Sequence, residues 1–337
     1  MNLYLKSGYI DWERLAKVPA SFLFVYGGRG AGKTYGCLKY VLEHKIPFIF
    51  TRRQQQEYDM VCRDDTSPFK VLNEDLNLDI HVRTISKNVS GIYQGDSSLP
   101  IGYMTSLGAF AHIRGMDFSD VKWWIYDEFI PEPHVRPMKE EGQAWANAYE
   151  TICRNRELKG EDPVKFVGLA NTNNLANPLF VELELVGIVE RLRKRGTNYF
   201  LIPDRGIALV DTVDSPISGE KKETALYKLM NKNSEYYRMS IENRFRDLDE
   251  AKPVSRNLNE YRPVVEIAEI TLYRHKHERK FYCSMHHTGV CKTFTSSEID
   301  KERCLRAFEW IPQMYLENKI EFETYMCEVL FNRYLFS

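Results

Sequence analysis

Short apolar runs punctuate the first half of the chain and end abruptly at glycine or polar residues. The runs 21–26 and 48–51 flank residues 34–43, in which apolar residues such as Cys37 and Val41 recur at helical spacing. A buried parallel strand is a continuous apolar run, and a crossover helix carries one apolar stripe. This order therefore predicts a strand, a helix and a second strand parallel to the first.

The pattern continues beyond residue 120. A third run, 121–126, is rich in aromatic residues and stops at two carboxylates, Asp127 and Glu128. Apolar residues at helical spacing follow over 145–152, and another apolar run covers 166–169. The alternation predicts a doubly wound, mostly parallel α/β sheet, in which functional side chains lie at the carboxyl ends of the strands.

Two regions have a weaker pattern. Polar stretches surround the short apolar runs 80–82 and 101–104, so we expect strands embedded in loops between residues 54 and 120. After about residue 200 the chain becomes rich in turn residues, and a charged helical stretch covers 221–235.

These changes predict three domains. We expect an N-terminal domain over 1–205, a linker domain over 206–245 and a C-terminal domain over 246–337, with strands followed by helices in the last. A length of 337 residues exceeds what one hydrophobic core usually holds, which supports more than one domain.

The amino-acid composition restricts the partners and the cellular environment that we expect for the protein. Lys and Arg total 46 against 47 for Asp and Glu, so the net charge of -1 favours no partner, and contact with nucleic acid must come from local patches. The seven cysteines are an odd number without a preceding signal segment, which predicts reduced thiols. No apolar run approaches the ~20 residues of a membrane helix, so we expect a soluble protein without membrane contact.

The glycine-rich segment after the first strand matches the phosphate-loop pattern G-x-x-x-x-G-K-[ST]. Its residues are Gly27, Gly28, Arg29, Gly30, Ala31, Gly32, Lys33 and Thr34. Glycines allow backbone N–H groups to converge on phosphate oxygens at a helix N-terminus. Lys33 would bind the β- and γ-phosphates, and Thr34 would bind Mg²⁺.

The two carboxylates complete this chemistry. Asp127 is the candidate second ligand of the metal, and Glu128 can orient and deprotonate a water, which suits a hydrolase. Asn171 ends a buried strand and either senses the γ-phosphate or caps a turn. Residues 231–234 lack the Asp of a guanine-reading motif, so we expect ATP rather than GTP.

Basic residues form three groups of interest. Arg154 and Arg156 follow the predicted helix, and either one is a candidate arginine finger supplied to a neighbouring subunit or a surface salt-bridge partner. The runs 274–280 and 191–195 are candidates for contact with a phosphate backbone, and a solvated hairpin turn explains the first run equally well.

Four potential metal ligands lie close together in the C-terminal domain. They are Cys283, His286, His287 and Cys291. Their spacing does not repeat a ligand pair, so we do not expect a zinc site.

Taken together, these motifs resemble those of the genome-packaging ATPases of small short-tailed bacteriophages, the phi-29 type. The resemblance spans most of the chain. It is carried by residues 24–35, 48–53, 126–130 and 154–157, by Asn171, and by Asn177 with Pro178.

The resemblance implies a fold and an assembly. It implies a P-loop NTPase domain of the additional-strand catalytic-glutamate (ASCE) type, a linker, and a C-terminal RNase H-like domain with a vestigial nuclease site. It also implies a homomeric ring, expected to be a pentamer, that moves double-stranded DNA into a procapsid. Its partners would be the phage portal or connector and a structural packaging RNA, and it would work in the host cytoplasm, transiently on the procapsid.

The resemblance further assigns roles to two arginines. In that family the first arginine of the Arg-Asn-Arg-Glu motif acts across the subunit boundary, which favours Arg154 over Arg156. A basic residue ahead of the acidic strand also acts in trans, and Arg114 matches its position. It is Arg where the phi-29 protein has Lys, a change that keeps the charge and alters the geometry.

The expected C-terminal nuclease strand, 264–270, departs from the nuclease pattern because it offers Glu266 and Glu269 in place of a metal-binding Asp. Residues three apart on a strand point to opposite faces, so we expect no nuclease activity. We expect the DNA-gripping loops within residues 54–100. Two alternatives to a packaging motor stay open: a ring helicase or DNA-pumping ATPase for replication or conjugation, and a non-catalytic nucleotide-dependent scaffold.

Overall fold

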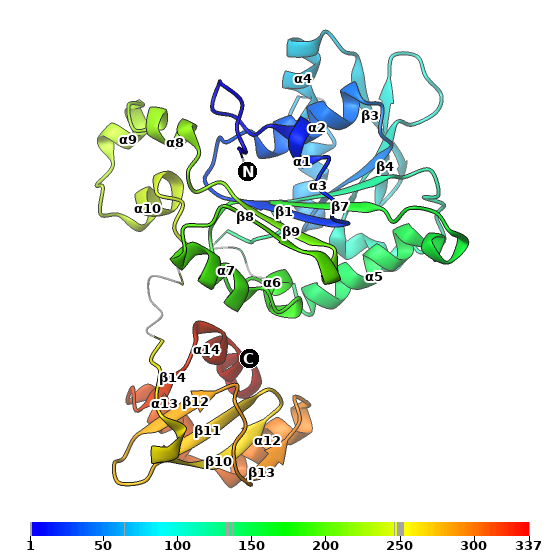
Figure 1. Cartoon of the computed structure of the whole chain (residues 1–337). Helices are drawn as coiled ribbons and strands as arrows, with labels where there is room; N and C mark the ends of the chain where they lie inside the picture. The colour runs from blue at the N-terminus through cyan, green and yellow to red at the C-terminus, as the bar shows by residue number, and fades with distance from the viewer. Residues whose placement is uncertain are drawn as a thin grey trace. The chain divides into compact units, whose positions relative to one another are not determined.

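The computed structural model of the chain describes residues 2–63, 65–132, 135, 138–245, 247 and 253–336. It divides into two compact units, each with its own β-sheet (Figure 1). The first unit comprises residues 1–185 and 189–246, and the second comprises 186–188 and 247–337. Within the described residues, no helix has both the length and the apolar character needed to cross a membrane.

The first unit is built on a nine-stranded sheet with the order β3-β4-β5-β2-β6-β7-β1-β9-β8. The six strands from β5 to β9 in this order are parallel, and the pairs β3–β4, β4–β5 and β8–β9 are antiparallel. The strands are β1 (Phe22–Tyr26), β2 (Phe48–Arg52), β3 (Ile80–Ser86), β4 (Val89–Gln94), β5 (Gly102–Ser106), β6 (Trp123–Asp127), β7 (Lys165–Ala170), β8 (Tyr199–Ile202) and β9 (Ile207–Asp211).

Helices cover both faces of this sheet, as the sequence pattern predicts for a parallel sheet (Figure 1). On one face, α2 buries Leu38 and Val41 against the strands, and on the other α5 buries Trp145 and Ile152. The helices are α1 (Trp12–Leu15), α2 (Lys33–Glu43), α3 (Gln55–Val61), α4 (Phe69–Leu76), α5 (Glu141–Cys153), α6 (Pro178–Glu182) and α7 (Val186–Lys194).

The strand order confirms the ASCE class. Strand β7 pairs with β1 on one side and with β6 on the other, so it is the additional strand between the phosphate loop and the acidic pair. All three strands are parallel, and their carboxyl ends meet at one edge of the sheet. The fold therefore brings Gly27, Asp127 and Asn171, which follow or end these strands, to one place.

The region between residues 54 and 120 is more regular than the sequence suggests. It contains α3, α4 and the antiparallel strands β3 and β4. The two expected strands are confirmed as β3 and β5, whereas the expectation of loops around them was wrong, because α3, α4 and β4 also form there. The expected gripping region 54–100 contains α3, α4, β3 and β4. The helices are short, and α4 buries only Phe69 and Leu72, so neither leaves a long periodic pattern in the sequence.

The sheet also extends further along the chain than expected. Strand β9 pairs in parallel with β1, and all five of its residues are buried. The boundary expected at residue 205/206 is therefore too early, because the sheet continues to Asp211. The single helical stretch expected over 221–235 is instead divided among α8 (Pro216–Lys221), α9 (Ala225–Leu229) and α10 (Glu235–Ile241).

The second unit has a five-stranded mixed sheet with the order β13-β10-β11-β12-β14. The central strands are antiparallel, while β13 pairs in parallel with β10 and β14 in parallel with β12. Its elements are β10 (Tyr261–Ile267), β11 (Ile270–His275), β12 (Phe281–Ser284), β13 (Lys292–Phe294), β14 (Ile320–Phe322), α12 (Glu298–Ala307), α13 (Trp310–Leu316) and α14 (Tyr325–Phe336). Strands followed by helices agree with the expectation, and the RNase H-like relationship stays a prediction.

Candidate active site

The phosphate loop lies between the end of β1 and the start of α2, as the sequence predicts. Its glycines are required by contact as well as by conformation. Gly27 has a φ of +148°, and a Cβ there would lie 1.8 Å from the Thr212 hydroxyl oxygen. A Cβ at Gly28 would lie 1.8 Å from the Asn243 side-chain oxygen. The loop is thus packed closely against residues that follow β9.

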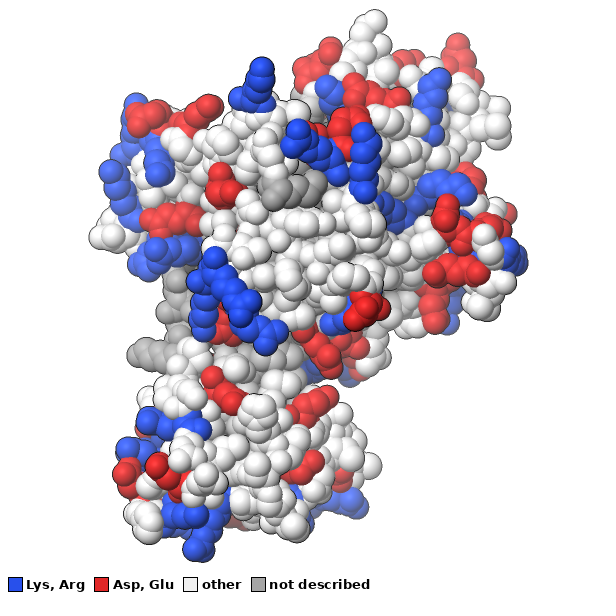
Figure 2. Space-filling view, viewed as in Figure 1, with Lys and Arg blue, Asp and Glu red and all other residues white. Residues whose placement is uncertain are grey.

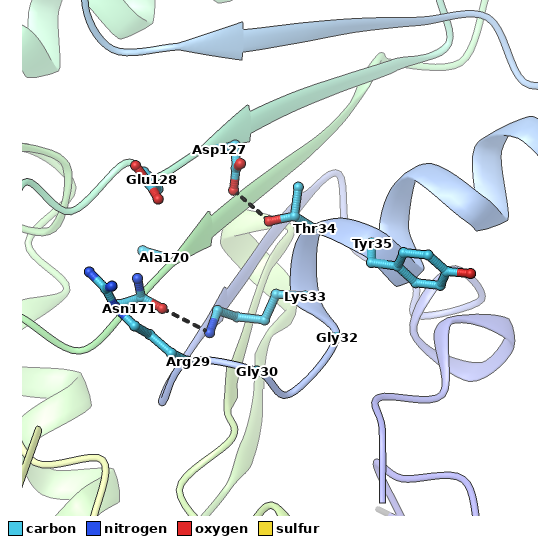
Figure 3. Close-up of a pocket in the computed structure, with 10 residues that line it drawn as sticks. All are labelled: Arg29, Gly30, Gly32, Lys33, Thr34, Tyr35, Asp127, Glu128, Ala170 and Asn171. Carbon is cyan, nitrogen blue, oxygen red and sulfur yellow. Dashed lines mark hydrogen bonds between the residues drawn. The ribbon is translucent and has the colours of Figure 1, made fainter. Parts of the chain in front are cut away.

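Lys33 lies at the centre of the loop, with only 8% of its surface exposed. Its ammonium donates hydrogen bonds to the carbonyl oxygens of Gly27 at 3.0 Å and Gly28 at 2.6 Å. It also donates to the side-chain oxygen of Asn171 at 3.2 Å (Figure 3). Burial lowers the pKa of Lys33 to about 7, although nearby Asp127 opposes this shift. A buried ammonium with neutral oxygen partners is suited to bind an anion.

Thr34 and Asp127 form the candidate metal site. The Thr34 hydroxyl donates to the Asp127 carboxylate at 2.9 Å, and Asp127 is almost fully buried at the end of β6 (Figure 3). A hydroxyl and a carboxylate oxygen side by side are the hard oxygen donors that Mg²⁺ prefers when it also binds substrate phosphates. The donor set therefore fits the metal expected from the sequence.

Glu128 follows directly in a left-handed backbone conformation, with a φ of +56°. This conformation is uncommon for a residue other than glycine, asparagine or aspartate. The side chain is half-buried, and this burial raises the pKa of Glu128, while the charge of Arg52 opposes the shift. A raised pKa suits a carboxylate that must accept a proton from water.

Arg52 is the residue that sequence reasoning missed at this site. Its guanidinium pairs with Asp127 at 2.9 Å and with Glu128 at 2.5 Å. Arg52 ends β2, which is the neighbour of β6 in the sheet, so the two strand ends place these groups side by side. Only the strand order reveals this contact, since the residues are 75 positions apart.

Lys33, Thr34, Asp127 and Glu128 line one cleft with a volume of about 320 Å³. Figure 3 shows Asp127 and Glu128 on one side of Lys33. Arg29 and Asn171 lie beside the ammonium of Lys33. The lining residues are Arg29, Gly30, Gly32, Lys33, Thr34, Tyr35, Asp127, Glu128, Ala170 and Asn171. The structure thus brings together most of the predicted site, and its volume is in the range of small-molecule pockets.

The two arginines expected to act in trans lie elsewhere. Arg154 follows α5 and donates to the carbonyl oxygens of Arg114, at 3.1 Å, and Met116. Neither Arg154 nor Arg114 lines the cleft, and both are exposed. Arg156 differs, because it is buried and donates to the backbone oxygens of Val121 and Ser119. Arg156 therefore holds the chain in place, whereas Arg154 is exposed and pairs with exposed Asp117 at 3.9 Å.

Some side chains of the basic runs 191–195 and 274–280 form ion pairs within the chain. Figure 2 shows basic and acidic side chains interspersed over the visible face, with one basic group where Figure 1 draws α7. In that run, Arg193 pairs with buried Asp211 at 2.6 Å and Lys194 pairs with Glu190. The run 274–280 covers the end of β11 and the turn to β12.

Two histidines of the second unit, His286 and His287, lie near glutamates. His286 lies 3.4 Å from Glu323, and His287 lies 3.7 Å from Glu266. The carboxylate of Glu269 instead accepts a hydrogen bond from Tyr334. Among the described residues, no three His, Cys, Asp or Glu side chains are placed to share a metal ion.

Comparison with known proteins identifies the family. The comparison with curated proteins found no match. The fold is similar to that of the bacteriophage phi-28 gp11 DNA packaging motor, at 15% identity and a TM-score of 0.64, over 96% of this chain and 97% of that chain. It is also similar to the bacteriophage phi-29 viral genome packaging motor assembly, at 14% identity and a TM-score of 0.62, over 96% and 99%. The family model for the podovirus DNA encapsidation protein (Gp16) matches residues 5–267, so the chain belongs to this family.

Proposed function

We propose that this member of the DNA encapsidation family is a Mg²⁺-dependent ATPase whose hydrolysis cycle drives double-stranded DNA into a procapsid. The observation that carries the proposal is the convergence of Lys33, Thr34, Asp127 and Glu128 on one cleft at the ends of β1 and β6. Membership of the DNA encapsidation family indicates that the cargo is DNA, and the side chains of the cleft indicate that the reaction is ATP hydrolysis.

Each side chain has a part in hydrolysis. Lys33 turns from the carbonyl oxygens of the loop to the β- and γ-phosphates, which replace those neutral partners with a stronger anionic one. Thr34 and Asp127 hold Mg²⁺, which would neutralise charge on the phosphate oxygens. Glu128 orients a water and accepts its proton. Asn171, already bonded to Lys33, is placed to contact the γ-phosphate.

The exposed arginines support catalysis shared between subunits. Arg154 and Arg114 lie together and away from the cleft of their own chain, as expected of groups that complete a neighbour's site. A closed ring satisfies this arrangement at every boundary. We propose that the ring is a pentamer attached to the portal, with a structural RNA as a further partner. The ring would act in the host cytoplasm while it is attached to the procapsid.

A DNA-protection assay tests the proposal. Purified chain, procapsids, duplex DNA, ATP and Mg²⁺ should yield DNA that resists added nuclease. Replacing Glu128 with Gln removes the proton acceptor, so we expect hydrolysis to fall by about 10²- to 10⁴-fold and protection to disappear. Chelation of Mg²⁺ should have the same effect. Glu43→Gln, on the exposed end of α2, is the matched control and should protect DNA as the unmodified chain does.

The same experiment separates the alternatives. Protection that survives in Glu128→Gln would identify a nucleotide-dependent scaffold instead of a motor. Separation of the strands of a forked duplex would identify a helicase. We also propose that the second unit has no nuclease activity, and supercoiled plasmid incubated with the chain and Mg²⁺ should therefore stay intact.

A further inference from the structure

The N-terminal segment of the chain is attached to the outside of the phosphate loop. The backbone N–H of Ile10 donates to the carbonyl oxygen of Ala31 at 3.2 Å. The indole N–H of Trp12 donates to the carbonyl oxygen of Gly32 at 3.2 Å. Ile10 and Trp12 are both buried, so the segment has a fixed position relative to the loop.

Tyr9 lies between two buried residues of this segment, Gly8 and Ile10, but is itself exposed. Its ring lies against Gly32, with Cδ1 3.1 Å from the position that a Cβ on that glycine would occupy. Nevertheless, 48% of Tyr9 is exposed. A large aromatic side chain is therefore held beside the phosphate loop with much of its surface open to solvent.

A second exposed tyrosine lies in the first turn of α2. Tyr35 lines the cleft and is 37% exposed. Its hydroxyl donates to the Asp75 carboxylate at 2.7 Å, a contact that restricts the ring. Figure 3 shows Tyr35 on the side of the loop away from Arg29 and Asn171.

The order of the phosphates determines what these rings face. In the proposed binding mode, Glu128 and Asn171 lie at the γ-phosphate end of the cleft, and backbone N–H groups of the loop hold the α- and β-phosphates. The nucleoside must then leave the loop on the side of Gly32 and Tyr35. We propose, given that the site binds ATP as proposed above, that Tyr9 and Tyr35 flank the nucleobase and bind it by aromatic stacking.

Stacking on an aromatic ring accepts any base, because every base has a π-face. The pair would therefore increase affinity for nucleotides over simple polyphosphates without selecting adenine against guanine. Loss of one stacking partner corresponds to roughly a 5- to 100-fold loss of affinity.

Binding to ATP and to inorganic tripolyphosphate tests this site directly. Both ligands carry a triphosphate, and only ATP carries a base. We would measure their dissociation constants with Mg²⁺ on the full chain carrying Glu128→Gln, which prevents hydrolysis. Adding Tyr9→Ala should weaken ATP by at least about fivefold and leave tripolyphosphate unchanged. Tyr35→Ala should do the same, while Tyr9→Phe and Tyr35→Phe keep the ring and should retain ATP binding.

Leu5→Ala is the matched control, because it removes an apolar side chain that is 49% exposed from the same segment. It should change neither constant. The proposal is overturned if the Tyr→Ala variants bind ATP normally, or if they lose ATP and tripolyphosphate equally, which would indicate damage to the loop. If the proposed ATPase function is wrong, the chain carrying Glu128→Gln alone should bind neither ATP nor tripolyphosphate. That outcome differs from failure of the stacking proposal.

Discussion

At the scale of single residues, the active site is a balance of opposite charges. Arg52 pairs with Asp127 and Glu128, and Arg29 pairs with Glu132, so each of these three carboxylates has an arginine partner. Lys33 has no carboxylate partner within salt-bridge distance among the described residues. A triphosphate with Mg²⁺ would supply the missing anion.

The pair between Arg52 and Glu128 predicts a pH effect. Burial raises the pKa of Glu128, and the Arg52 charge is the leading influence that lowers it. Replacing Arg52 with Gln removes that influence, so the pKa of Glu128 should rise further. Because the base must be deprotonated to accept a proton, the acid limb of kcat should move to higher pH.

This shift can be measured by following kcat for ATP between about pH 5 and 8. Arg279→Gln, an exposed arginine in the turn after β11, is the control and should leave the profile in place. An acid limb that stays fixed or moves to lower pH in Arg52→Gln would show that Arg52 does not set the charge state of the base.

At the scale of elements, the sequence predicts the parts of the site that lie on buried parallel strands. The strands β1, β2, β6 and β7 and the helix α2 follow from continuous apolar runs and one helical stripe. The role of Arg52 could not be predicted, because it depends on β2 and β6 being neighbours. Tyr9 was missed for the same reason, since only the fold places the N-terminal segment beside Gly32.

A buried ion pair joins the residue that follows β2 to the start of α5. Arg53 and Glu141 are 1% and 0% exposed and form two hydrogen bonds, of 2.9 and 2.7 Å, while Tyr126 also donates to Glu141. Glu141→Ala leaves the Arg53 charge buried without its partner, so the free energy of unfolding should fall by about 3–5 kcal/mol. Urea denaturation followed by circular dichroism would measure the loss.

The control for this pair is Glu43→Ala, which breaks the exposed pair with Lys39. Its effect should stay within about 1 kcal/mol, as is typical of surface pairs. Equal losses in the two variants would mean that the Arg53 charge reaches water in the folded state and that burial contributes little.

At the scale of the whole molecule, the cleft and Arg154, the proposed arginine finger, do not meet within one chain. Arg154 contacts the backbone of Arg114 and Met116 instead of the cleft. In a closed ring, each subunit presents one surface to a different surface of its neighbour. A finger on the first surface and a cleft on the second would form one complete site at each boundary.

Mixing two inactive variants tests whether the sites are shared. Lys33→Ala subunits lack a working cleft and keep Arg154, whereas Arg154→Ala subunits keep the cleft and lack the finger. Each alone should lose nearly all ATPase activity, since an arginine finger contributes about 10³- to 10⁵-fold. In equal mixtures, roughly one boundary in four joins an intact cleft to an intact finger, so activity with duplex DNA should partly return.

The control mixture combines Lys33→Ala with Glu128→Gln, in which every cleft is defective and every finger intact. It should stay inactive whether Arg154 acts in its own subunit or in its neighbour's. If activity returns only in the first mixture, Arg154 must act across the subunit boundary. An absence of recovery at all ratios, in rings shown to contain both variants, would mean that Arg154 acts within its own subunit or has no role in hydrolysis.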